Sequence, residues 1–279
     1  MFNSIIKTKL NKLIHFKKAG GSILYLAARF ISPGNFSRQL LNPSELRPKT
    51  HSARRINSLK TSRTKSYLEI GMHNGGTFEQ VNINLKHGIE PFPKFNTRIL
   101  PANTELFEIK SDEFFKSYCN SMLYDFVYID GSHEFRQVGR DLLNSLNHLS
   151  DGGRILMDDM IPSDSISSIA DMEISKIKRQ IARLPGNPNH GDCFKLLPFI
   201  FEHLSFIQPY LIIYPDNPQL LLVAPSNFRD FFNIQKISIA FENYNFNDLT
   251  FEELFDSNKL KQYPIYIEEL LLNHLKNKN

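Results

Sequence analysis

Residues 124–159 read YDFVYIDGSHEFRQVGRDLLNSLNHLSDGGRILMDD, and this stretch decides the fold. Two apolar runs, at 126–129 and 155–157, are each followed directly by acidic residues. Between them apolar residues recur at helical spacing, and Asp151-Gly-Gly is expected to end the helix. A strand, a helix and a strand in so few residues predict a βαβ unit. Its right-handed crossover makes the two strands parallel.

The acids after these strands are expected to lie at one edge of the sheet, because parallel strands finish at the same edge. They are Asp130, Asp158 and Asp159, with His133 in the turn after the first strand. Converging carboxylates repel one another unless a cation or a proton intervenes, and oxygen ligands suit Mg²⁺. The sequence therefore predicts a divalent-metal site at the three acids. Asp130 and His133 are the expected catalytic residues, with His133 as the base that takes a proton from a substrate hydroxyl.

The same residues also fit a structural interpretation. Asp130 can cap the helix that follows it, while Asp158 or Asp159 faces solvent. His133 can face solvent in the first helical turn, and we interpret His73, in an earlier turn, as structural. The sequence leaves the choice for the three acids and His133 open.

An earlier strand, YLEI, leads into the turn GMHNGGTF. Glu69, Gly71 and Gly75 form the pattern acid-x-Gly-x-x-x-Gly, in which glycines let the backbone turn tightly and approach a ligand. A second strand over 85–90 ends at Glu90, nineteen residues after Gly71. Nucleotide sites of α/β proteins place a ribose-binding carboxylate at a spacing of about 20. The turn differs from G-x-G-x-x-G, which disfavours a dinucleotide-dependent oxidoreductase.

The remaining elements follow from the same patterns. The sequence predicts a third strand, a short helix beginning near Asp112, two longer helices, an antiparallel hairpin and a final helix. Their expected ranges are 105–110, 114–118, 166–184, 193–206, 210–214 with 219–224, and 265–275.

Charge is distributed unevenly along the chain of 279 residues. Residues 1–66 hold fourteen Lys or Arg and one acid, Glu45, for a net charge of +13, whereas the rest carries −9. Helices are expected at 2–18 and 22–30, followed by a linker to residue 66 with one helical turn. Such a leader suits a phosphate-bearing surface, and of anionic lipid and nucleic acid we expect lipid, contacted through residues 1–60. A solvated arm and an organelle-targeting segment are the alternatives.

Together these features resemble the class I S-adenosylmethionine-dependent methyltransferases. More narrowly, the sequence is similar to small methyltransferases of polysaccharide and secondary-metabolite gene clusters. The segments that carry the resemblance are YLEIGMHNGGTF, HGIEPFP, SDEFF, FVYIDGSHEFRQVGRDLLNSLNHLSDGGRILMDDMIP and HGDCFK, all within residues 67–224. The resemblance implies an α/β, Rossmann-like fold: a mostly parallel sheet with a closing antiparallel hairpin and helices on both faces.

The resemblance also implies roles for individual residues. The methionine end of S-adenosylmethionine would lie on Glu69, Gly71 and Gly75, its ribose on Glu90, and its adenine near Asp112. In metal-assisted members, acids at the ends of the fourth and fifth strands hold the ion, and these positions correspond to Asp130, Asp158 and Asp159. Catechol-type relatives have a lysine base where this sequence has His133. Many nearer relatives have His-Asp in place of Asp158-Asp159, so the metal stays an open question.

These observations give an expected organisation and function. Residues 1–66 form a basic, partly helical extension, 67–225 the methyltransferase domain, and 226–279 a C-terminal helical extension. The expected reaction is O-methylation of a sugar or small-molecule hydroxyl by S-adenosylmethionine, with Mg²⁺ as the candidate metal. The alternative is a non-catalytic scaffold with a basic docking arm. Two cysteines at no metal spacing indicate a reducing compartment. The expected location is cytoplasmic, with the basic leader as the peripheral contact with the membrane.

Overall fold

The computed structural model describes residues 50–95, 103–186, 188–214, 217–246, 250–256 and 263–278. The helices expected at 2–18 and 22–30, with most of the basic leader, lie outside these residues. The described chain forms two compact units. The first contains residues 50–59 and 74–82, and the second contains 60–73 and the described residues from 83 onward.

The first unit consists of helices α4 (His51–Leu59) and α5 (Gly76–Gln80). Asn57 joins them, because its side-chain amide donates to the carbonyl of Gln80 over 2.9 Å. Helix α4 falls in the segment expected to be a linker with one helical turn, so the helix is longer than expected. Its buried residues Ala53, Ile56 and Leu59 recur every three positions, but basic residues between them hide the pattern.

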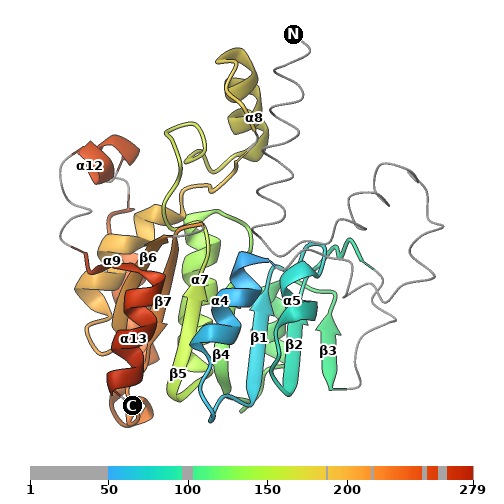
Figure 1. The fold of residues 1–279 in the computed structure, drawn as a ribbon, viewed down its shortest axis with the longest axis vertical. Coiled ribbons are helices and arrows are strands. Elements are labelled where there is room, and N and C mark those ends of the chain that lie inside the picture. Colours follow the sequence, from blue (N-terminus) through green and yellow to red (C-terminus); the bar gives the residue numbers. More distant parts are fainter. Residues whose placement is uncertain are drawn as a thin grey trace. The chain divides into compact units, whose positions relative to one another are not determined.

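The second unit is built on an eight-stranded sheet in the order β3-β2-β1-β4-β5-β7-β6-β8 (Figure 1). Strands β1 to β5 run parallel, and β7 is antiparallel to both β5 and β6. This arrangement confirms the Rossmann-like class with an antiparallel hairpin. The strands are β1 (Ser66–Ile70), β2 (Leu85–Ile89), β3 (Thr104–Phe107), β4 (Tyr124–Ile129), β5 (Leu149–Met157), β6 (Gln208–Tyr214), β7 (Gln219–Val223) and β8 (Ile265–Ile267).

Eight α-helices are described in this unit, and none of them has the length and apolar character that a membrane crossing requires. They are α6 (Ser111–Ser117), α7 (Phe135–Asn147), α8 (Met172–Ile181), α9 (Leu196–His203), α10 (Phe228–Phe231), α11 (Ile234–Asn243), α12 (Phe251–Asp256) and α13 (Glu268–Lys278). A 3₁₀ turn at Cys193–Lys195 leads into α9.

The central βαβ unit is confirmed as β4, α7 and β5. Helix α7 is capped by Glu134, whose carboxylate accepts from the backbone N–H groups of Arg136 and Gln137. The alternative in which Asp130 caps this helix is therefore wrong. The expected helix end at Asp151-Gly-Gly is also wrong, because β5 already begins at Leu149. Leu149 is fully buried and pairs with Tyr124 ahead of a register shift, so the glycines lie within an irregular part of the strand.

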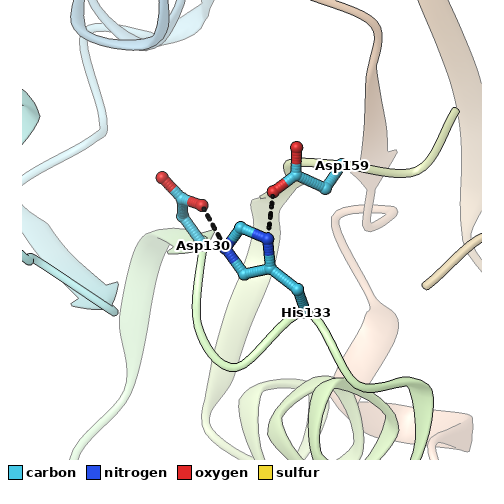
Figure 2. Close-up of side chains that lie close together, drawn as sticks. All are labelled: Asp130, His133 and Asp159. Atoms are coloured by element: carbon cyan, nitrogen blue, oxygen red, sulfur yellow. Dashed lines mark ion pairs between the residues drawn. The ribbon is translucent and has the colours of Figure 1, made fainter. Parts of the chain in front are cut away.

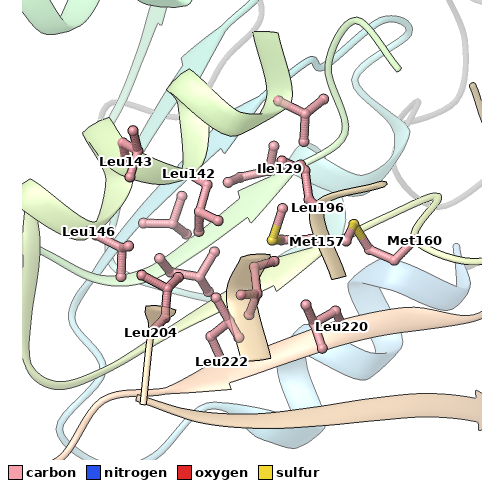
Figure 3. Packing of buried hydrophobic residues seen from close by; sticks show 14 of the residues in the cluster. Ile129, Leu142, Leu143, Leu146, Met157, Met160, Leu196, Leu204, Leu220 and Leu222 are labelled. Carbon is pink, nitrogen blue, oxygen red and sulfur yellow. The ribbon is translucent and has the colours of Figure 1, made fainter. Parts of the chain in front are cut away.

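The hydrophobic core lies between the sheet and α7, α9 and α11. Figure 3 shows Leu142 and Leu146 of α7 facing Leu220 and Leu222 of β7, all at most 1% exposed. Gly139 lets α7 and α11 approach closely, because a Cβ there would lie 2.2 Å from the ring of Phe241. Packing of this kind fixes the positions of β4 and β5, whose ends carry the acids.

The C-terminal segment differs from its expected form. A helix was predicted over 265–275, but Ile265–Ile267 form strand β8, parallel to β6, and α13 begins only at Glu268. Two isoleucines flanking a tyrosine favour a strand when a sheet edge is available to pair with. That edge is set by tertiary structure and is invisible in the local sequence.

Candidate active site

Asp130, His133 and Asp159 form a cluster in which one ligand atom from each lies within 4.8 Å of the others. Figure 2 shows the imidazole of His133 between the two carboxylates. Its Nδ1 is 3.1 Å from Oδ2 of Asp159, and its Nε2 is 3.7 Å from Oδ1 of Asp130. The cluster joins the end of β4, the end of β5 and the turn into α7, as the parallel strands led us to expect.

Two of these residues have backbone conformations that residues other than glycine rarely adopt. His133 has φ 59° and Asp159 has φ 57°, both in the left-handed region. Such conformations persist where the surrounding structure fixes them, and they concentrate at functional sites. Here the loop at 189–192 fixes the turn, because the N–H of Asp192 donates to the carbonyl of His133 over 3.1 Å. The carboxylate of Asp192 also accepts from the N–H of Phe135, the first residue of α7.

The hydrogen bonds of His133 define the role of each ring nitrogen. Nδ1 lies 2.7 Å from the carbonyl oxygen of Asn189, which can only accept, so we place the proton on Nδ1. A neutral ring then leaves Nε2 as an acceptor on the side of Asp130. Asp159, also close to Nδ1, orients the ring. The imidazole is thus arranged to take a proton or to bind a cation through Nε2.

Negative charge in the cluster is poorly compensated. Burial, followed by the charge of Asp158, raises the pKa of Asp130. Burial raises the pKa of Asp159 as well, and the charges of Asp158 and Asp130 add to this effect. Close carboxylates of this kind hold a proton or a cation between them. The chemistry of the donor set, two carboxylates and an imidazole, therefore fits a divalent cation.

Asp158 was expected to share the metal, and the structure gives it other partners. Its carboxylate accepts from the hydroxyl of Tyr128 over 2.5 Å, from Nδ2 of Asn217 over 2.5 Å and from Nε2 of Gln219 over 3.1 Å. It also accepts from the N–H of Asp159. The carboxylate of Asp158 therefore has hydrogen-bond donors within the protein. Its charge contributes to the raised pKa of Asp130 and of Asp159.

His190 is the residue near the cluster to which the sequence assigned no role. It is 9% exposed, its Nε2 lies 3.9 Å from Oδ1 of Asp159, and its Nδ1 has no hydrogen-bond partner among the described residues. Burial lowers the pKa of its imidazole. The signal was present, because His190 opens the HGDCFK segment, but nothing local placed that segment against β5.

The first turn, where the cofactor was expected, lies beside the cluster. Gly71 has φ +87°, and a Cβ on it would lie 2.0 Å from the carbonyl oxygen of Asp130. This glycine is therefore required by the contact between two parts of the protein, before any ligand is considered. Glu69, two residues before Gly71, is buried, and its carboxylate accepts from the hydroxyl of Tyr67 over 2.6 Å. The chain order of the sheet reverses between β1 and β4, the place where open α/β sheets bind ligands.

The other expected cofactor residues are found in separate settings. Glu90 follows β2, and its carboxylate accepts from the N–H groups of His73 over 2.7 Å and Phe92 over 3.0 Å. Gly75 belongs to the first unit, where it caps α5 with φ 72°. Asp112 lies in the first turn of α6, half-exposed, and pairs with Arg140 over 3.3 Å.

Asp141 on α7 is a buried acid that the sequence did not single out. It is 1% exposed, accepts from the Ser111 hydroxyl over 2.6 Å, and would contact a Cβ placed on Gly131. Burial raises its pKa to about 6, and hydrogen bonds from Ser111 and Gln137 oppose the rise.

We expect Asp141→Asn to stabilise the protein at pH 7. The raised pKa means that the folded state holds the proton more tightly than the unfolded chain, so stability falls as pH rises from about 4 to about 6. Asparagine has no proton to lose, and the gain at pH 7 should be about 1–3 kcal/mol. Urea unfolding at pH 4.5 and pH 7 measures it, and an equal effect at both values would contradict the assignment.

A cavity of about 430 Å³ adjoins the loop that supports His133. Asp192, which bonds the His133 carbonyl, is one of its lining residues, and Lys195 pairs with Asp192 over 3.0 Å. The lining combines charged, hydroxyl and aromatic side chains. It includes Ser168, Asp171, Phe194, Thr250 and Phe251.

Three solved structures are among those similar to this chain. The SAH-bound methyltransferase PaMTH1 from Podospora anserina is 14% identical, covers 77% of this chain and 94% of its own, and has a TM-score of 0.48. Cofactor-bound Rv0187 from MTB is 14% identical, with coverage of 73% and 89% and a TM-score of 0.47. The O-methyltransferase from Bacillus cereus in complex with SAH is 12% identical, with coverage of 67% and 86% and a TM-score of 0.47.

A family model described as a methyltransferase domain matches residues 68–160. The matched segment runs from β1 to the residue after Asp159, and so includes the first turn, Glu90 and the whole cluster. No curated protein matches the sequence. The matched segment therefore contains all three residues of the cluster.

Proposed function

We propose that the S-adenosylmethionine-dependent methyltransferase domain of this chain transfers a methyl group to a hydroxyl oxygen of an acceptor held at Asp130, His133 and Asp159. The observation that carries this proposal is the position of the cluster. It lies at the carboxyl edge of the sheet, directly beside the Gly71 turn, because Gly71 touches the backbone of Asp130. An acceptor bound there would be next to a methyl donor bound at the turn.

For the cofactor we propose the residues that the sequence indicated. Glu69, Gly71 and Gly75 would bind the methionine end, Glu90 the ribose and Asp112 the adenine side. Glu90 supports this assignment, because its carboxylate is fixed by backbone N–H groups at the end of β2, where ribose-binding acids of α/β folds lie. When bound, the sulfonium cofactor supplies an electrophilic methyl group.

The protein's own residues would then prepare the acceptor. Methyl transfer needs an aligned oxygen whose proton is removed. Nε2 of His133 is the acceptor for that proton, since Nδ1 is held by Asn189 and Asp159. Asp159 stabilises the protonated ring, and Asp130 on the other side can accept a hydrogen bond from the hydroxyl. The loop at 189–192 keeps this arrangement in place.

A divalent cation is the proposed partner of this cluster. Asp130 and Asp159 would hold it, with Nε2 of His133 nearby, and Asp158 would add negative charge without direct contact. A bound cation lowers the pKa of an acceptor hydroxyl. Mg²⁺ fits the carboxylates, and an imidazole in the group also suits Mn²⁺.

The acceptor we propose is a small hydroxyl compound, and a sugar in particular. The cavity beside Asp192 supports a sugar, because it combines aromatic faces with hydroxyl and charged groups. Release of S-adenosylhomocysteine with a panel of sugars, with and without EDTA, would identify the acceptor and its dependence on a cation.

The domain boundaries we propose remain 1–66, 67–225 and 226–279, although β8 of the last segment extends the sheet.

Binding of S-adenosylmethionine by the full chain is the test of the proposal, and Glu90→Ala is expected to weaken it roughly ten- to hundredfold. The reason is the loss of charged hydrogen bonds, each of about 1.5–3 kcal/mol. Calorimetry measures the affinity. Glu105→Ala is the matched control, since Glu105 is an exposed acid on β3 and should leave binding unchanged. A folded wild-type protein that does not bind the cofactor would favour the non-catalytic scaffold.

A further inference from the structure

Helix α8 turns its apolar side chains outward. Ile174, Ile177 and Ile181 are 46%, 53% and 78% exposed, and their spacing of three and four residues puts them on one face of the helix. Leu184, three residues beyond Ile181, is 42% exposed and continues the row. Figure 1 shows α8 standing away from the sheet. Four large apolar side chains in one exposed row mark an interaction site rather than scattered surface residues.

The opposite face of α8 is polar and is the one that is buried. Arg179 is 4% exposed, and its Nη2 donates to both carboxylate oxygens of Asp164, at 2.6 and 2.5 Å. Ser175, one turn earlier, is 2% exposed and donates to the carbonyl of Ile166 over 2.8 Å. A helix that packs on a core normally buries its apolar face, so this helix is held in the reverse orientation.

Both ends of α8 are capped, and these caps stabilise the helix that carries the exposed apolar row. Asp171 accepts from the N–H groups of Glu173 and Ile174 at the first turn. At the last turn the N–H of Leu184 bonds to the carbonyl of Arg179, and Arg183 takes the left-handed conformation with φ 55°. This is the Schellman arrangement that ends many helices.

Charge decides which partner fits the face. The exposed charged residues around the row are three basic ones, Lys176, Lys178 and Arg183, and two acids, Asp171 and Glu173, which both precede Ile174. The surface around Ile177, Ile181 and Leu184 is therefore cationic. A second copy of α8 packed in parallel would bring these basic residues together, and the chain's own leader, at +13, is also basic. An apolar row with basic neighbours instead matches an anionic lipid surface, where the apolar residues enter the interface and the lysines contact the headgroups.

We propose that α8 docks this protein on an anionic lipid membrane. Docking would act next to the cluster, because α8 lies in the segment that begins just after Asp159 and ends at His190. The N–H of His190 bonds to the carbonyl of Ser167 at the base of this segment, over 3.0 Å. The proposal does not depend on the methyl-transfer assignment, since it rests on α8 alone.

Co-sedimentation of the full chain with vesicles tests the proposal. Vesicles of phosphatidylcholine with phosphatidylglycerol should bind the wild-type protein, and phosphatidylcholine alone should bind it more weakly. The variant Ile177→Glu/Ile181→Glu should lower binding by about tenfold or more, since it removes two apolar side chains from the interface and adds two negative charges. The control Ile239→Glu/Leu270→Glu adds the same charges at residues 65% and 60% exposed on other helices, and should bind like the wild type.

Three results would overturn the proposal. One is equal binding by the α8 variant and the wild type, which would assign membrane contact to the leader. Another is equal loss in the control variant, which would show a general charge effect. The third is a wild-type dimer in sedimentation velocity that the α8 variant abolishes, together with no vesicle binding, which would assign the face to a second copy. Unchanged cofactor affinity and circular dichroism in the variant establish that it is folded.

Discussion

Replacing Asp159 by asparagine is expected to abolish methyl transfer while leaving cofactor binding and the fold intact. Asparagine tolerates the left-handed backbone at this position better than alanine does, so the loop should keep its shape. The loss of charge should remove the cation and the orientation of His133 together. We expect the rate to fall by about a thousandfold or more, corresponding to several kcal/mol in the transition state. S-adenosylhomocysteine release with a competent acceptor measures it.

The same variant should be more stable than the wild type above neutral pH when no cation is present. Burial and neighbouring acids raise the pKa of Asp159, so the folded wild type loses stability as pH rises from about 4. The gap to the variant should open over that range and reach about 1–3 kcal/mol at pH 8. A rate loss joined to a stability gain is the pattern of a functional residue, and a stability loss at pH 8 would contradict it.

Asp158→Asn provides the contrast at the neighbouring position. Its carboxylate accepts from Tyr128, Asn217 and Gln219, and an amide cannot accept from all three. This variant should therefore be destabilised by about 1–3 kcal/mol, the usual cost of an unmet buried donor. Two adjacent acids would then respond with opposite signs in the same urea titration.

Gly191→Ala is expected to damage both the fold and the site. A Cβ on Gly191 would lie 1.8 Å from the carbonyl oxygen of His133, so the loop and the His133 turn must separate. We expect a loss of about 3 kcal/mol or more in unfolding free energy. Turnover should fall by at least about a hundredfold, since a displacement of about 1 Å at reacting groups has that effect.

Gly186→Ala is the matched control for this variant. Gly186 has a similar left-handed φ of +74°, but the nearest atom to its added Cβ would be Cδ of Pro188, at 3.7 Å. It should therefore show only the cost of the backbone conformation, about 1 kcal/mol, and keep its activity. Equal effects from the two substitutions would mean that the contact with His133 is unimportant.

The fold was largely predictable because its signals are local. The apolar runs before Asp130 and Asp158, with a helical pattern between them, define β4, α7 and β5 without long-range information. Strand β8 was missed for the opposite reason: Ile265 and its neighbours form a strand only because the edge of β6 is there. Helix α4 was underestimated because its apolar residues are interspersed with basic ones.

The candidate site was also predictable only in the features that depend on local sequence and strand order. Chain topology was enough to bring Asp130 and Asp159 to one edge. It could not show that Asp158 would turn toward Tyr128 and two amide side chains, because Asn217 and Gln219 come from the distant β6–β7 hairpin. Nor could it place His190, which arrives from a separate loop. Strand ends are specified locally, whereas the direction of each side chain depends on partners far away in the sequence.

Binding of Mn²⁺ to the full chain, followed by electron paramagnetic resonance, tests the central claim most directly, because it reports the cation site without an acceptor. The wild type should bind one ion, and Asp159→Asn and Asp130→Asn should each remove it. Asp112→Asn, at a half-exposed acid paired with Arg140 on α7, should leave it in place. Mn²⁺ that stays bound in the Asp159 variant, or a wild type that binds none, would contradict the account.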